Sequence, residues 1–232
     1  AALLSFVAGM VNVTGVLSIQ TLITNVTGHF AYFAEEIMKR DYAAAMTFFV
    51  FIIFFLFGAF ISNFLSELVS KKHPNLHHVI PISIEITILI GVAIFGVQTE
   101  LGSNEGKWVA SSMLFAMGMQ NALVTKISKS TVRTTHLTGL FTDLGIELSQ
   151  LFFYKKPEER KRLKKSIYLR LSIIAFFFIG CISGGFIYNA LQLKTLFVAA
   201  TFLLIALLYD YIRLSFFVIK RKAIFKKAIL NK

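Results

Sequence analysis

The chain contains apolar stretches that are long enough to cross a lipid bilayer as helices. Residues 43–65 and 195–212 are each about the ~20 residues that a helix needs to span the hydrocarbon core. Only 16% of the residues are charged, whereas soluble domains carry about 25%. Because backbone groups in lipid must be paired within the chain, such stretches fold as helices. The sequence therefore predicts an all-α, polytopic membrane helix bundle.

The net charge of +12 does not indicate nucleic-acid binding. Lys and Arg gather in short loops and near the C-terminal end, as the positive-inside rule describes. We therefore expect the lipid bilayer, and no nucleic acid, as the partner of these charges. Cys181 lies in an apolar run and predicts neither a disulfide nor a metal site, and we expect no cofactor. The chain has no G-x-x-x-x-G-K-[ST] loop that would indicate ATP-driven transport.

A single transmembrane domain, 1–232, is predicted to hold eight helical segments. These are 1–19, 29–40, 42–69, 80–98, 107–126, 139–154, 166–190 and 194–219. The basic stretch "KKPEERKRLKK" is interpreted as a linker before the seventh segment, and 220–232 as a basic tail. The spacings of Gly58 with Ser62 and of Gly180 with Gly184 predict close helix packing.

Three phrases recur in the same order in the two halves of the chain. "GMVN" recurs as "GMQN" after 109 residues, "TNVTGHF" as "THLTGLF" after 111, and "FFLFGAFIS" resembles "FFFIGCISG" after 122. The extra eleven positions equal the basic linker, which we interpret as an insertion. The pattern predicts two internal repeats, 1–100 and 107–221.

The second and sixth segments are short. The twelve residues of 29–40 would span about 18 Å as a helix, less than the ~30 Å hydrocarbon core. If both segments re-enter instead of crossing, Lys and Arg divide 18 to 4 between the two sides, rather than 16 to 6. Three spans per half would make the repeats inverted, 3+3. Either arrangement places the C-terminus in the cytoplasm, and we expect the bacterial inner membrane.

The repeated phrase places a Thr-Gly pair at the edge of an apolar segment in each half. Gly allows a close approach, Thr can cap the helix that follows, and a helix N-terminus attracts an anion or a carbonyl. Buried amides can bind a polar ligand, although they also join membrane helices. The alternative for Thr-Gly is an ordinary interfacial cap. The predicted substrate-binding residues are Asn12, Thr27, Gly28, His29, Gln120, Asn121, His136, Thr138 and Gly139.

Three acids are candidates for ion coupling, because ionisable residues at membrane depth are costly. Glu85 lies within an apolar run, where burial favours the neutral acid and allows proton loading and release. Asp143 and Glu147 are four residues apart and share a helix face, which suits a cation or a proton or, alternatively, hydrogen bonds to Thr or Asn that support packing. His29 and His136 flank the two breaks, but two such residues predict no metal site.

Two stretches carry a family resemblance, "FVAGMVNVTGVLSIQTLITNVTGHF" and "FAMGMQNALVTKISKSTVRTTHLTGLFTDLG". They resemble the YoaK-like family, bacterial inner-membrane proteins defined as a domain of unknown function. The resemblance covers essentially the whole chain and implies a multi-span membrane protein that transports a solute. Family members often carry Thr-Gly-Asn where this chain has His29. The resemblance implies no substrate and no catalytic residue.

Together these observations predict a secondary transporter of a small polar or anionic solute that works by alternating access. Coupling to protons is part of this hypothesis, and a homo-oligomer is compatible with it. The alternatives are a membrane-embedded enzyme acting on a lipid or small metabolite, and a scaffold or sensor that transports nothing. We expect a transporter rather than an enzyme.

Overall fold

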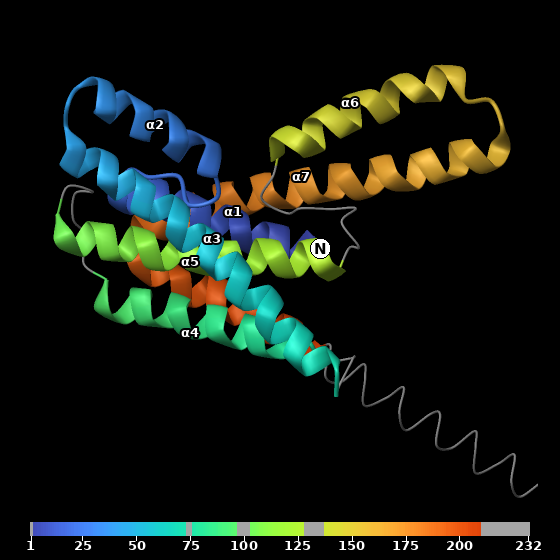
Figure 1. The fold of residues 1–232 in the computed structure, drawn as a ribbon. Coiled ribbons are helices and arrows are strands. Elements are labelled where there is room, and N and C mark those ends of the chain that lie inside the picture. Colours follow the sequence, from blue (N-terminus) through green and yellow to red (C-terminus); the bar gives the residue numbers. More distant parts are fainter. Residues whose placement is uncertain (1, 73–75, 97–102, 128–136, 210–232) are drawn as a thin grey trace, which may run out of the picture.

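The computed structural model describes residues 2–72, 76–96, 103–127 and 137–209, and these residues form helices joined by short connections (Figure 1). The helices are α1 (Ala2–Ile19), α2 (Val26–Met38), α3 (Tyr42–Ser70), α4 (Val79–Phe95), α5 (Asn104–Ile127), α6 (Leu137–Phe153) and α7 (Pro157–Leu191). A 3₁₀ turn, Gln192–Lys194, leads into a further helix over 195–209. The predicted all-α class is confirmed.

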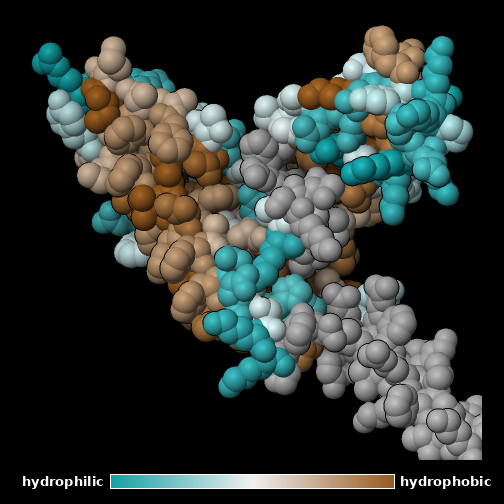
Figure 2. All heavy atoms as spheres, turned by 45° about the vertical axis from the view of Figure 1, so that its right-hand side comes forward, coloured by the Kyte–Doolittle hydropathy of each residue, from teal (hydrophilic) through white to brown (hydrophobic). Residues whose placement is uncertain are grey.

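Within the described residues, three helical stretches are long and apolar enough to cross a membrane: α1, α3 and the stretch 157–209. Helix α4 is apolar but shorter. Large apolar side chains cover the outside of α3, including Leu56, Phe57 and Phe60, each at least half exposed. Apolar side chains also dominate the surface of one lobe in Figure 2. Since lipid is the solvent that suits such a surface, the chain is a membrane protein.

Helices α3 and α5 cross at two glycines. A Cβ atom on Gly58 would overlap the carbonyl oxygen of Phe115, and one on Gly118 would overlap that of Phe55. Each glycine therefore lets the partner backbone approach where any other residue would hold it away. The predicted packing role of Gly58 is confirmed.

Helices α1 and α7 cross in the same way. A Cβ atom on Gly9 would overlap the carbonyl oxygen of Phe177, and one on Gly180 would overlap that of Phe6. The Cys181 thiol also donates to the Gly9 carbonyl oxygen over 3.3 Å. All four helices thus carry the same Phe-x-x-Gly segment at their crossing, at 6–9, 55–58, 115–118 and 177–180. The repeated phrases contain two of these segments, 55–58 and 177–180, and the glycines of the other two, Gly9 and Gly118.

The stretch 157–209 is two helices and not one rod, because the chain reverses at the 3₁₀ turn. Contacts at Ser5 and Ile173, and at Gly184 and Met10, show that α7 runs parallel to α1. The helix 195–209 returns along α1, with the rings of Phe6 and Phe202 5.0 Å apart. Gln192 makes the reversal with a positive φ of 52°. Helix α4 packs against α5 in turn.

Helices α2 and α6 lie outside the four crossing helices. In the described part of the chain, α2 packs against α3 and α6 packs against α7. Figure 1 shows that both begin near the middle of the bundle and run toward opposite ends of it. The α2–α3 turn and the α6–α7 turn therefore lie at opposite ends of the molecule.

The structure corrects several predicted boundaries. The seventh helix begins at Pro157 and not at residue 166, so most of the supposed basic linker is helical. Proline suits the first helical turn, Glu158 and Glu159 favour the positive end of the helix dipole, and Lys and Arg are good helix formers. The second helix starts at Val26 and not at residue 29, and the fourth ends at Phe95. The predicted tail, 220–232, and the end of the second repeat lie outside the described residues.

Candidate functional site

The break between α1 and α2 is held by the side chain of Asn12. Its Oδ1 accepts hydrogen bonds from the Ile23 amide over 3.1 Å, the Thr24 amide over 3.2 Å and the Thr24 hydroxyl over 2.9 Å. Residues 20–25 are not helical; the Gln20 and Thr21 amides still donate to carbonyls of α1, whereas those of Ile23 and Thr24 need other partners. Asn12 therefore replaces the hydrogen bonds that a continuous helix would have supplied.

His29 holds the same break from the other side. Its Nε2 lies 2.8 Å from the carbonyl oxygen of Leu22, and since a carbonyl can only accept, this nitrogen carries the proton. The ring is buried between the rings of Phe48 and Phe51, with centroids 6.1 and 5.6 Å away. Its Nδ1 is buried with no hydrogen-bond partner. The structure thus brings Asn12 and His29, both predicted site residues, together around one break.

The residue that caps α2 is Asn25 and not Thr27. Asn25 precedes the helix, and its Oδ1 accepts from the Gly28 amide over 3.1 Å. Thr27 already lies in the first turn and is exposed. The capping role predicted for Thr27 was wrong, because the helix starts earlier than predicted and Asn is at least as good a cap as Thr. A Cβ on Gly28 would make only ordinary contacts, the nearest at 3.4 Å to Asn25.

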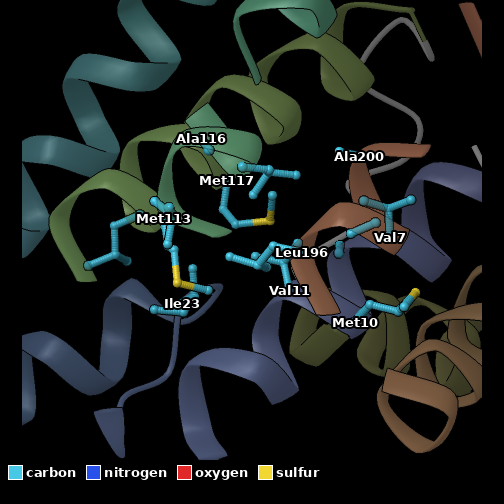
Figure 3. Close-up of a cluster of buried hydrophobic side chains, with 14 of the residues drawn as sticks. Val7, Met10, Val11, Ile23, Met113, Ala116, Met117, Leu196 and Ala200 are labelled. Carbon is cyan, nitrogen blue, oxygen red and sulfur yellow. The ribbon is translucent and has the colours of Figure 1, made fainter. Parts of the chain in front are cut away.

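The break also carries an apolar side chain into the centre of the bundle. Ile23 is fully buried and packs on Gly15, where an added Cβ would collide with it. Figure 3 shows Ile23 pointing toward Met113 in the central cluster. The labelled members of this cluster are Val7, Met10, Val11, Ile23, Met113, Ala116, Met117, Leu196 and Ala200. The middle of the bundle is therefore filled by apolar side chains in this conformation.

The residues predicted in the second half are placed separately. Thr138 and Gly139 lie in the first turn of α6, and His136 lies outside the described residues. Gln120 is fully buried on α5 and donates from Nε2 to the Leu4 carbonyl on α1 over 2.6 Å. The side-chain oxygens of Gln120 and Asn121 are buried without partners. Among the described residues, no hydrogen bond links these groups to the break after α1.

The three candidate ion-coupling acids differ in their surroundings. Glu85 is buried on α4, and its Oε1 has no hydrogen-bond partner. Asp143 and Glu147 share a face of α6, as predicted, and both bind Arg170 of α7, over 2.8 and 3.0 Å. Ser166 also donates to Glu147 over 2.6 Å. The two α6 acids therefore have a structural cation, whereas none of the described Lys or Arg residues pairs with Glu85.

The described residues form no three-membered group of metal-ligating side chains.

A cavity of about 450 Å³ lies between the end of α4 and the start of α5, lined by Gly91, Phe95, Glu105 and Trp108 among others. None of the predicted site residues lines it. At the turn after α2, Lys39 donates hydrogen bonds to the carboxylates of Glu35 and Glu36, and these bonds raise the pKa of Lys39.

Comparison with known proteins assigns the family. Residues 1–209 match the family described as "Protein of unknown function (DUF1275)", and the chain belongs to this family. The match spans all the described helices and confirms the expected domain of unknown function, without testing the narrower YoaK-like name. No curated protein and no solved structure matches the chain.

Proposed function

We propose that the protein is a secondary transporter of a small polar or anionic solute, built from two inverted halves around a central site. The observation that carries this proposal is the pair of outer helices, α2 and α6, of 13 and 17 residues, which begin near the middle of the bundle and run in opposite directions (Figure 1). Helices of this kind, with their N-termini at mid-depth, form the solute sites of many transporters with inverted repeats.

The glycine crossings support the inverted halves. Moving Phe6 and Gly9 on by 109 residues gives Phe115 and Gly118, and moving 55–58 on by 122 residues gives 177–180. These are the offsets of the repeated phrases. With these offsets α1 corresponds to α5 and α3 corresponds to α7. Each glycine and each Phe carbonyl of the α1–α7 crossing then has its equivalent in the α3–α5 crossing. Each crossing joins one half to the other, so the halves can tilt about two equivalent points.

In this proposal the structure represents a closed state. Ile23 fills the centre while Asn12 and His29 hold the break that carries it. Release of the break would expose the amides of residues 22–24 and the start of α2, whose positive dipole end suits an anion. The unpaired oxygens of Gln120 and Asn121 are acceptors available to the donor groups of a solute. Alternating access then requires the second half to open when the first closes.

Glu85 is the proposed proton carrier, because it is buried, no cation of the described residues pairs with it, and the sequence contains no nucleotide loop. Glu85→Gln keeps the shape of the side chain but cannot release a proton. We expect it to abolish solute accumulation driven by a pH gradient while preserving exchange of bound solute. The measurement is uptake into proteoliposomes of a solute first identified by its thermal stabilisation of the protein.

Glu158→Gln is the control, since Glu158 is exposed in the first turn of α7. It should leave coupling unchanged. Unaltered gradient dependence in Glu85→Gln would remove Glu85 from the mechanism, and uptake that ignores every ion gradient would make the protein a facilitator. Recovery of a chemically altered solute from the vesicles would favour the enzyme alternative.

The proposed orientation places the α2–α3 turn outside the cell and the α6–α7 turn in the cytoplasm. In a Cys181→Ala background, Arg40→Cys should react with an impermeant thiol reagent on intact cells. Lys156→Cys, which is also exposed, should react only after lysis, because the two turns lie at opposite ends of the bundle. Protection of Arg40→Cys until lysis would contradict both this orientation and the re-entrant placement of α2.

A further inference from the structure

The turn between α6 and α7 carries a dense patch of positive charge. Seven Lys and Arg residues occur between 155 and 165, with Glu158 and Glu159 as the only acids in that interval. All seven are exposed: Lys155, Lys156, Arg160, Lys161, Arg162, Lys164 and Lys165. Lys156 pairs with Glu159 over 3.7 Å, a surface contact of little strength. Figure 2 shows hydrophilic side chains gathered over the lobe at the upper right, which is formed by α6 and the start of α7. The patch needs anions that lie outside the chain.

Exposed aromatic residues lie beside these cations. Phe152 and Phe153 end α6 with more than four fifths of their surface exposed, Tyr154 follows them, and Tyr168 is three quarters exposed on α7. The contacts of Glu147 with Ser166 and of Asp143 with Arg170 show that α6 runs antiparallel beside α7. The last turn of α6 therefore lies level with the basic turns of α7. Aromatic rings and cations share one depth at this end of the bundle.

The length of α7 indicates where its basic turns lie relative to the membrane. Its 35 residues extend about 52 Å, well beyond the ~30 Å hydrocarbon core. The charged residues occupy its first turns and the later turns are apolar, so the excess length projects from the membrane at the basic end. Lys and Arg near a span reach the headgroup layer, and aromatic rings favour the boundary below it.

We infer that the α6–α7 turn, residues 152–165, is a docking surface for the headgroups of anionic phospholipids in the adjacent leaflet. The aromatic rings enter the boundary between headgroups and acyl chains, and the cations bind the lipid phosphates above it. A basic segment next to a span is attracted to an anionic membrane surface by charge complementarity. Among α1 to α7, the contacts of α6 are with α7, and the surface holds α6 at a defined depth. This inference does not depend on transport.

The test places a reporter within the patch. Trp108, the only tryptophan, is replaced by Phe, and Tyr154→Trp supplies a fluorophore in the full chain, reconstituted into lipid nanodiscs. The discs contain phosphatidylcholine with a minority of phosphatidylglycerol, and bromine is carried by one lipid or the other at equal mole fraction. Brominated phosphatidylglycerol should quench the fluorescence more strongly, with a local enrichment of about fivefold for each headgroup bound by a cation. High salt should reduce the difference.

Two four-residue variants form the matched comparison. The combined variant Arg160→Gln, Lys161→Gln, Lys164→Gln and Lys165→Gln should abolish the difference between the brominated lipids, and Gln preserves helix propensity. The control neutralises four cations elsewhere, with Lys39→Gln, Arg40→Gln, Lys107→Gln and Lys194→Gln, and should retain it. Because Tyr154→Trp could disturb folding, the anionic lipid retained by the protein without this substitution is also measured by mass spectrometry, with and without the patch cations.

Equal quenching by the two brominated lipids, or equal lipid retention with and without the patch cations, would overturn the inference. Free inorganic phosphate at matched ionic strength should leave the quenching unchanged. Competition by phosphate would reassign the patch to a soluble anion and would also overturn it.

Discussion

Gly118→Ala should destabilise the protein by roughly 1–3 kcal/mol or more, the cost of forcing atoms into a packed interior. The new methyl group would overlap the Phe55 carbonyl oxygen and lie 3.2 Å from the Ala59 amide nitrogen. Both are backbone atoms of α3, so no side-chain rotation relieves the contact. We expect a lower denaturation midpoint in dodecyl sulfate titrations of the purified protein. Gly9→Ala should have the same effect, because its methyl group would meet the Phe177 carbonyl oxygen and the Cys181 amide nitrogen, the equivalent backbone atoms of α7.

Gly91→Ala and Gly145→Ala are the matched controls. An added Cβ at either position meets no atom within 4 Å. Because Ala favours the helix over Gly by up to about 1 kcal/mol, these variants should be neutral or stabilised. If Gly118→Ala proves as stable as these controls, that result would contradict the close approach of α3 and α5 in the structure.

Asn12→Ala should release the break between α1 and α2. It removes the single acceptor shared by the amides of Ile23 and Thr24 and by the Thr24 hydroxyl. Leaving a buried donor without a partner costs about 1–3 kcal/mol. We expect faster hydrogen exchange at the Ile23 and Thr24 amides, measured by mass spectrometry of the peptide that contains them. Transport should fall as well, if the proposed closed state depends on this contact.

Asn121→Ala provides the comparison, because the side-chain oxygen of Asn121 accepts no hydrogen bond. Its stability and the exchange at residues 22–24 should stay close to those of the wild type. Asn12→Asp keeps an acceptor oxygen and should retain most of the protection. Equal exchange in Asn12→Ala and in wild type would show that the break is held by the packing of Ile23 alone.

Local patterns were sufficient for the helical architecture. Apolar runs of about twenty residues can only be helices in lipid, and the ends of α1 and α3 were predicted to within a residue. The start of α7 was misplaced because its charged first turns lack apolar periodicity, although Pro157 and the two glutamates that follow are a helix-start signal. Asn25, which immediately precedes α2, is a preferred cap residue and was likewise a helix-start signal in the sequence.

The chemistry of the polar residues depended on what stands opposite them. Asn12 and Asn121 occupy matching places in "GMVN" and "GMQN", yet one holds a backbone break and the other has a free oxygen. Asp143 and Glu147 share a face by spacing alone, but Arg170, which binds both, lies on the next helix. A hydrogen bond needs a partner within about 3 Å, and helix periodicity specifies neighbours only along the same helix.

The amino-acid sequence was enough to establish a membrane-embedded helical chain and to suggest a repeated unit, because both follow from composition, helix periodicity and recurring phrases. Only the tertiary structure showed that Phe6 and Gly9 meet α7 while Phe55 and Gly58 meet α5. It also showed that Ile23, and not a polar group, fills the centre. The physical reason is the distance along the chain between the packing partners. Close packing depends on complementary shapes of segments that are far apart in the sequence, whereas periodicity relates only residues of the same helix.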